Sequence, residues 1–170
     1  MAFSPVRLNH AVLFVADLDR SVTFYTGTFG MEVMAREPRA NAAFLRLPRS
    51  DNHHDLGLFG VGTGGGPKVR GAVGLYHLAW QVDTIDELVS AREVLLERRA
   101  YTGESSHGAT KSLYGADPDG NEFEIMWMLP RDEWGNFENT ATTEPLDLDA
   151  EARRWSGVPT AGHIVSQPAP

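Results

Sequence analysis

The chain has 170 residues, 42% hydrophobic and 22% charged, which suits one compact globular unit or two small modules that share a core. A net charge of −8, with no basic run longer than Arg98 and Arg99, argues against nucleic acid as a partner. No apolar stretch approaches the ~20 residues of a membrane span, and residues 1–10 carry no secretory signal, so we expect a cytoplasmic protein without a membrane partner. Since cysteine is absent, any metal must be held by nitrogen and oxygen.

The first elements along the chain are a strand, a helix and three further strands. Residues 8–15 have the apolar character of a strand, and residues 18–29 repeat apolar side chains at helical spacing. Strand candidates follow at residues 31–36, 42–47 and 54–61, with turn residues between them. This order predicts a βαβββ module over residues 1–61.

The same pattern returns after a glycine-rich segment, residues 62–74, which we expect to be a linker. Residues 75–82 repeat residues 8–15 with an offset of 67 residues, so that His10 and His77 coincide. A helix at 85–99 and strands at 101–105, 110–115 and 122–128 complete a second module, residues 75–130. Residues 131–170 form an extension and tail with a short helix at 148–155, from which we expect little chemistry.

Two βαβββ modules predict an α+β fold. We expect their strands to form a cup-shaped, barrel-like mixed sheet with the helices outside. His10 and His77 then lie on equivalent strands and face each other across the cup.

Glu124 is unusual because it stands in the apolar run of residues 123–128, where a carboxylate needs a proton, a cation or a metal to offset its desolvation. Taken singly, Glu124 is more simply a solvent-facing strand residue, and His10 and His77 are ordinary histidines. The repeat favours a metal site, since two imidazoles and one carboxylate hold Fe(II) and leave coordination positions open. The same offset carries Glu124 onto Gly57, so the first module supplies no fourth ligand.

The segment before Glu124 carries a recognisable motif, made of His107, Leu113, Tyr114, Asp117, Pro118 and Gly120. With it, residues 6–128 resemble the vicinal oxygen chelate superfamily, and within it the type I extradiol (catechol 2,3-) dioxygenases. The resemblance implies Fe(II) held by His10, His77 and Glu124. The sequence leaves Fe(II) versus Mn(II) open, since both ions accept this ligand set. The resemblance also implies a catechol-type substrate that is opened by O2 to a hydroxymuconic semialdehyde-type product, and a homo-oligomer, because superfamily members often pair.

The resemblance further implies three catalytic residues. His54 would be a histidine beside the metal that acts as an acid, although regular strand alternation would place His53, not His54, on the face of Gly57. Both histidines therefore stay open for this role. Tyr114 would hydrogen-bond the ionised catechol oxygen, and His107 would support the substrate or Tyr114.

Two other functions share the fold. A glyoxalase-like lyase or isomerase, or an epoxide-opening thiol transferase, usually takes a fourth ligand from the first module, where this chain has Gly57. A metal-free antibiotic-binding protein of the bleomycin-resistance kind needs neither the ligand set nor Tyr114. Several apolar residues either line the cup or simply form core: Phe44, Phe59, Trp80, Met126 and Met128.

Overall fold

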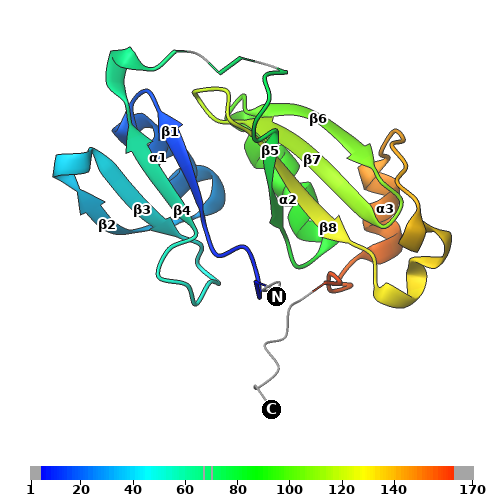
Figure 1. The fold of residues 1–170 in the computed structure, drawn as a ribbon. Coiled ribbons are helices and arrows are strands. Elements are labelled where there is room, and N and C mark those ends of the chain that lie inside the picture. The colour runs from blue at the N-terminus through cyan, green and yellow to red at the C-terminus, as the bar shows by residue number, and fades with distance from the viewer. Residues whose placement is uncertain (1–4, 67, 70, 163–170) are drawn as a thin grey trace, which may run out of the picture. The chain divides into compact units, whose positions relative to one another are not determined.

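The computed structural model describes residues 5–66, 68–69 and 71–162, so residues 163–170 of the expected tail and residues 67 and 70 of the expected linker lie outside the described residues (Figure 1). Contacts divide the chain into two compact units. The first runs up to Ala72 and includes the turn Asp117–Asn121, and the second comprises Val73–Ala116 and the chain from Glu122 onward. Within the described ranges, none of the helices has the length and hydrophobicity of a membrane span.

The first unit is a four-stranded mixed sheet with one helix packed on it. Its elements are β1 (Ala11–Val15), α1 (Leu18–Phe29), β2 (Glu32–Glu37), β3 (Ala42–Arg46) and β4 (Leu56–Gly60). The strand order is β1-β4-β3-β2, and β1 pairs in parallel with β4 while the other pairs are antiparallel. The Asp17 side chain caps the start of α1, and Gly30 in the left-handed conformation ends it.

The second unit repeats this topology and adds a C-terminal extension. Its elements are β5 (His77–Gln81), α2 (Ile85–Glu97), β6 (Tyr101–Ser106), β7 (Thr110–Ala116), β8 (Glu122–Met128) and α3 (Leu148–Trp155). The order β5-β8-β7-β6 matches that of the first sheet, strand for strand. Helix α2 packs on the sheet and on α3, as the ribbon shows (Figure 1).

The predicted α+β fold of two βαβββ modules is confirmed. Each sheet is open and not closed into a barrel, with β1 and β2 as the edge strands of the first and β5 and β6 as those of the second. Strands β1, β2 and β5 start one to three residues later than predicted, at Ala11, Glu32 and His77. Strand β4 also starts later, because it begins at Leu56 and not at residue 54. The Asp55 carboxylate explains the difference: it accepts hydrogen bonds from the Leu47 amide, the Ser50 hydroxyl and the Asn52 side chain. These bonds hold the residues before Leu56 in a loop, because an Asp side chain can satisfy backbone donors that a strand would otherwise pair.

The Asp-Pro-Asp-Gly turn between β7 and β8 belongs to the first unit by its contacts. The Asp117 carboxylate is buried and accepts hydrogen bonds from the Tyr25 hydroxyl (3.1 Å), from the Asp119 amide and from the backbone and side chain of Asn121. Asp119 accepts from the Ala16 amide and pairs with Arg20 at the start of α1. These bonds attach the turn to α1 and to Ala16 before it, so the two aspartates of the turn also stabilise the fold.

Replacing Tyr25 with Phe tests this packing. The variant loses one hydrogen bond to a buried carboxylate, so we expect its free energy of unfolding at pH 7 to fall by about 1.5 kcal/mol, as urea unfolding would show. Phe24→Leu, on the same helix, is the control, because it changes side-chain size without removing a hydroxyl. A stability equal to that of the wild type would contradict the role given to this bond.

Tyr25→Phe should also change how the free energy of unfolding depends on pH above pH 10. Burial, and then the charge of Asp117, raise the pKa of Tyr25. Above about pH 10 the unfolded chain releases the Tyr25 proton and the folded chain keeps it, so the stabilisation present below pH 10 is lost as pH rises. In Tyr25→Phe, the loss of stability per pH unit above pH 10 should therefore be smaller by up to about 1.4 kcal/mol.

Candidate functional site

Three predicted site residues lie on one face of the second sheet. Strand alternation buries Phe123, Ile125 and Trp127 on the helix side of β8, which turns Glu124 to the opposite face. Glu124 pairs with Tyr114 on β7 and with Ala79 on β5, whose neighbour on the same face is His77. Only every second residue of the apolar run around Glu124 therefore lies in the core, and the Glu124 carboxylate on the other face is partly exposed.

His77 and Glu124 are in direct contact. His77 Nε2 lies 3.0 Å from Glu124 Oε2, and the two side chains are 26% and 13% exposed. His77 Nδ1 is buried and makes no hydrogen bond with the described part of the chain. His77 Nε2–H therefore donates to the Glu124 carboxylate, and the same nitrogen and oxygen could coordinate a metal if that proton were lost, at a position that is mostly shielded from water.

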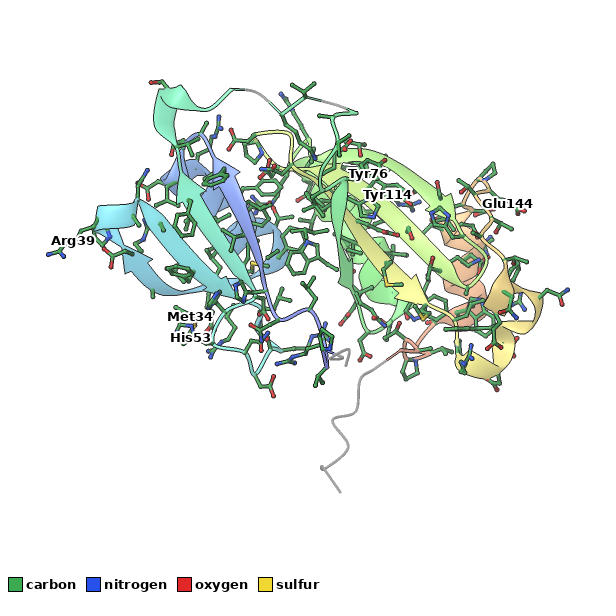
Figure 2. All side chains as sticks on the ribbon, viewed as in Figure 1. Met34, Arg39, His53, Tyr76, Tyr114 and Glu144 are labelled. Atoms are coloured by element: carbon green, nitrogen blue, oxygen red, sulfur yellow. The ribbon has the colours of Figure 1, made fainter. Side chains whose placement is uncertain are left out.

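The pair lines a cavity of about 540 Å³ in the second unit. The lining residues are Tyr76, His77, Ser105, His107, Thr110, Tyr114, Glu124 and Thr143. Tyr76 and Tyr114 lie close together on this unit (Figure 2). Burial, and then the Glu124 carboxylate, raise the pKa of Tyr114, so its hydroxyl keeps its proton at neutral pH. The structure therefore brings four of the six predicted site residues to one cavity.

The hydrogen bonds of His107 define its tautomer. His107 Nδ1 lies 2.8 Å from the carbonyl oxygen of Thr142, and His107 Nε2 lies 2.6 Å from the Tyr114 hydroxyl. A carbonyl oxygen can only accept, so Nδ1 carries the proton and donates it to Thr142. In the neutral ring Nε2 then has a lone pair, and the Tyr114 hydroxyl donates to it.

Thr142 and Thr143 belong to the extension, from which the sequence predicted little chemistry, yet both contact residues of the candidate site. Thr143 lines the cavity and Thr142 bonds His107, because residues 142–144 run beside the end of β6. Thr142 acts through its backbone carbonyl, which no side-chain pattern reveals. Tyr76 was also missed, although its place directly before a predicted ligand was a usable signal.

The other two predicted residues, His10 and His54, lie together in the first unit. Their rings pack with centroids 4.5 Å apart, and the Phe44 ring meets the His54 ring edge-on at 5.0 Å. His53 is exposed and contacts His54 through Nδ1. Because β4 begins only at Leu56, strand alternation does not govern either histidine, and the packing favours His54 as the neighbour of His10. Burial, and then the neighbouring charge of His10, lower the pKa of His54.

A chain of amides fixes the tautomer of His10. The Asn52 side-chain nitrogen donates to Asp55 and to the Asn9 carbonyl, so its oxygen is the atom that accepts from Arg7 and from the Asn9 side chain. The Asn9 side-chain oxygen is then free to accept from His10 Nδ1, 2.9 Å away. His10 therefore carries its proton on Nδ1 and leaves the Nε2 lone pair free, the form in which a histidine binds a metal.

The register of the first sheet places Gly57 where the second sheet has Glu124. Val12 pairs with Gly57 as Ala79 pairs with Glu124, and Phe44 pairs with Gly57 as Tyr114 pairs with Glu124. A Cβ at Gly57 would stand 3.3 Å from a Val12 methyl carbon and 3.5 Å from the Phe44 ring. In the first sheet an aromatic ring thus covers the position that the Glu124 side chain occupies in the second.

Among the described residues, no group of three or more histidine, aspartate and glutamate side chains is arranged to hold a metal ion. The structure brings together two of the three predicted ligands, His77 and Glu124, in the second unit. His10 belongs to the first unit. The three-ligand site stays a prediction.

Comparison with proteins of known function gives relatives of two catalytic types. The chain is 30% identical over 92% of its length to a catechol-2,3-dioxygenase of Bacillus subtilis (strain 168), and 35% identical over 71% to biphenyl-2,3-diol 1,2-dioxygenase 3 of Rhodococcus globerulus. It spans only 58% and 62% of those two relatives. It is also 31% identical over 75% of its length to a probable chloroplastic lactoylglutathione lyase of Arabidopsis thaliana, of which it spans 37%.

Solved structures share the fold of this chain. A glyoxylase/bleomycin resistance protein/dioxygenase domain from Frankia sp. EAN1pec superposes with a TM-score of 0.64 at 25% identity, over 75% of this chain and 96% of that one. A fosfomycin resistance protein, FosX, from Listeria monocytogenes shares the fold with a TM-score of 0.58 at 19% identity, over 77% of this chain and 99% of its own. The family model that matches residues 7–125 is that of the Glyoxalase/Bleomycin resistance protein/Dioxygenase superfamily, and the chain belongs to this superfamily.

Proposed function

We propose that this protein is a metal-dependent extradiol dioxygenase that opens a catechol-type ring with O2. The observation that carries the proposal is the cavity in which the His77–Glu124 pair and the Tyr114–His107 pair lie together. The relatives named as catechol and biphenyl-diol dioxygenases support the substrate class. Because the chain spans about three fifths of those relatives, their complete activity is part of the proposal.

His10, His77 and Glu124 would hold the metal, Fe(II) or Mn(II). His77 Nε2 and Glu124 Oε2 lie 3.0 Å apart, so one ion could bind both atoms in place of the proton between them. His10 offers a free Nε2 lone pair with its Nδ1 already bonded, as metal-binding histidines do. The bound ion would supply Lewis acidity, which lowers the pKa of a coordinated catechol hydroxyl, and a route for electrons from the ring to O2.

Tyr114 and His107 would remove a proton from the substrate. The Tyr114 oxygen has free lone pairs, so it can accept the catechol proton while its own proton passes to His107 Nε2. His107 then carries both ring protons and keeps donating from Nδ1 to the Thr142 carbonyl. After the transfer Tyr114 holds the former catechol proton and donates it back as a hydrogen bond to the ionised oxygen, which is the role expected for it from the sequence.

His54 would act as an acid and base beside the metal ligand His10. Its ring packs against His10 on one side and Phe44 on another, which fixes its position near that ligand. An imidazole can take up and return a proton near neutral pH, so His54 suits the delivery of a proton during ring opening.

A glyoxalase-like lyase is the second candidate, because relatives near 30% identity carry the name lactoylglutathione lyase. Such enzymes usually use a fourth protein ligand from the first module. Gly57 occupies the equivalent register position and Phe44 covers it, which favours a site with three protein ligands. If no metal binds, the alternative is a metal-free antibiotic-binding protein of the same fold. We also propose that the protein is a cytoplasmic homo-oligomer.

Protein loaded with Fe(II) under anaerobic conditions should consume O2 and produce a yellow product with at least one member of a catechol panel. His54→Ala should lose turnover by at least about 100-fold and keep its iron, because general acid and base groups contribute roughly 10²–10⁴-fold. Glu124→Ala should lose both, as measured with an oxygen electrode and by elemental analysis. Equal iron retention in the two variants would contradict the assignment, as would a wild-type protein that binds no iron and takes up no oxygen.

The amide chain behind His10 gives a separate test that needs no turnover. In Asn9→Ala the acceptor that holds His10 Nδ1–H is lost, so we expect the Kd for Mn(II) to rise about tenfold, the lower end of typical losses on removing such a partner. Asn136→Ala, on the exposed turn Gly135–Asn139, is the matched control and should leave the Kd unchanged. Anaerobic metal titration would measure both, and equal affinity in Asn9→Ala and the wild type would remove His10 from the ligand set.

A further inference from the structure

The C-terminal extension forms a strand-like pairing at the end of β6. The Ser106 amide donates to the Glu144 carbonyl and the Glu144 amide donates to the Ser106 carbonyl, both at 2.9 Å. Glu144, labelled in Figure 2, marks this segment beside the second sheet. The pairing places residues 142–144 against the strand end from which His107 projects.

The segment separates two cavities of the second unit. Ser105, His107 and Thr143 line the cavity of the candidate site. Ser106, Thr142 and Glu144 line a second cavity of about 360 Å³ behind it. Alternate residues of the two paired segments therefore face opposite sides, as in a regular sheet.

His107 receives both of its Nδ1 contacts from this segment. The Thr142 carbonyl lies 2.8 Å from Nδ1, and the Thr143 hydroxyl lies 3.3 Å from the same atom. Without the Thr142 carbonyl nothing described in the structure would require the proton to sit on Nδ1. With the proton on Nε2 instead, His107 would donate to Tyr114, and the Tyr114 hydroxyl would point its own proton elsewhere.

A buried ion pair ties the extension to the strand that carries Tyr114. The Lys111 side chain on β7 is 7% exposed, and its Nζ contacts the Ser106 hydroxyl at 2.9 Å and Glu151 Oε1 on α3 at 3.3 Å. Glu151 Oε2 also accepts from Trp155 Nε1 at 3.0 Å. Breaking such a pair leaves a buried charge without its partner, so α3 is held firmly against β7.

A second contact holds the extension at the loop after His107. Gly108 has φ +75°, and a Cβ there would collide with the Phe137 ring of the extension. The loop after His107 is therefore shaped by a glycine that lets an aromatic ring of the extension lie directly on the backbone.

We infer that the extension is a positioning element of the candidate site, which holds His107 as the Nδ1–H tautomer and so directs the Tyr114 proton toward His107. Thr142 supplies the contact, and the Ser106–Glu144 pairing and the Lys111–Glu151 pair keep it in place. The consequence for catalysis rests on the proposed function, but the tautomer is a property of the protein alone.

The test measures the tautomer of His107 by ¹⁵N NMR of the 170-residue chain without metal or catechol. Wild-type protein should show His107 with Nδ1 protonated and Nε2 unprotonated, and His107→Gln assigns the signals. Glu144→Pro removes the amide that donates to Ser106, and we expect its His107 to become a mixture of tautomers. Ala141→Pro, in the same segment but outside the pairing, adds the same rigid ring and should keep the wild-type spectrum.

Activity provides the second readout. If the protein is a dioxygenase, Glu144→Pro should lower kcat about tenfold with KM changed less than twofold, and should shift the pH profile, whereas Ala141→Pro should do neither. A wild-type His107 protonated on Nε2, or an unchanged tautomer in Glu144→Pro, overturns the inference. Because the spectra contain no metal or substrate, failure of the dioxygenase proposal alone would leave them as expected.

Glu151→Gln covers the case in which Glu144→Pro does not fold. This variant keeps the acceptor for Trp155 and removes the charge that pairs with Lys111, so we expect faster hydrogen exchange at the Ser106 and Glu144 amides and a partial shift of the His107 tautomer. Faster exchange without any tautomer shift would show that the extension is merely packed beside the site, and would overturn its positioning role.

Discussion

The register of β5, β8 and β7 is the constraint on which the candidate site depends. Because Glu124 pairs with Ala79 on one side and Tyr114 on the other, one sheet face collects the carboxylate, the Tyr114 hydroxyl and the nearby imidazole of His77. A shift of one residue along β8 would turn Glu124 into the core and Phe123 or Ile125 into the cavity. The apolar alternate residues of β8 prevent this, so the core packing fixes the position of the polar groups.

The two sheets use one register for different purposes. In the first sheet, Gly57 and Phe44 occupy the positions that Glu124 and Tyr114 hold in the second. Its histidines, His10 and His54, lie just before the starts of β1 and β4, where their rings pack together. The two repeats therefore share the backbone topology but carry different side chains at the equivalent positions.

Much of this could be predicted from the sequence, because the information lay in side-chain periodicity. Helix Leu18–Phe29 and strand Glu122–Met128 follow from the spacing of their buried residues, and the equivalence of Gly57 with Glu124 follows from the repeat. Side-chain periodicity does not reveal hydrogen bonds between side chains and the backbone. Hydrogen bonds to the Asp55 carboxylate keep residues before Leu56 out of β4, so strand alternation does not set the direction of the His54 side chain. The Thr142 carbonyl carries no side-chain signal, since any residue at that position has one. The anchoring of Asp117 by Tyr25 was equally invisible, because it joins residues 92 positions apart.

The central claim is that two histidines and one carboxylate hold the metal, with one histidine from each repeat. X-ray absorption spectroscopy of the protein loaded with Fe(II) under anaerobic conditions counts imidazole ligands directly through their multiple-scattering signal. Wild-type protein should show two imidazoles, with one remaining in His10→Ala and one in His77→Ala. Three or more imidazoles in the wild type, or two in either variant, would contradict the account.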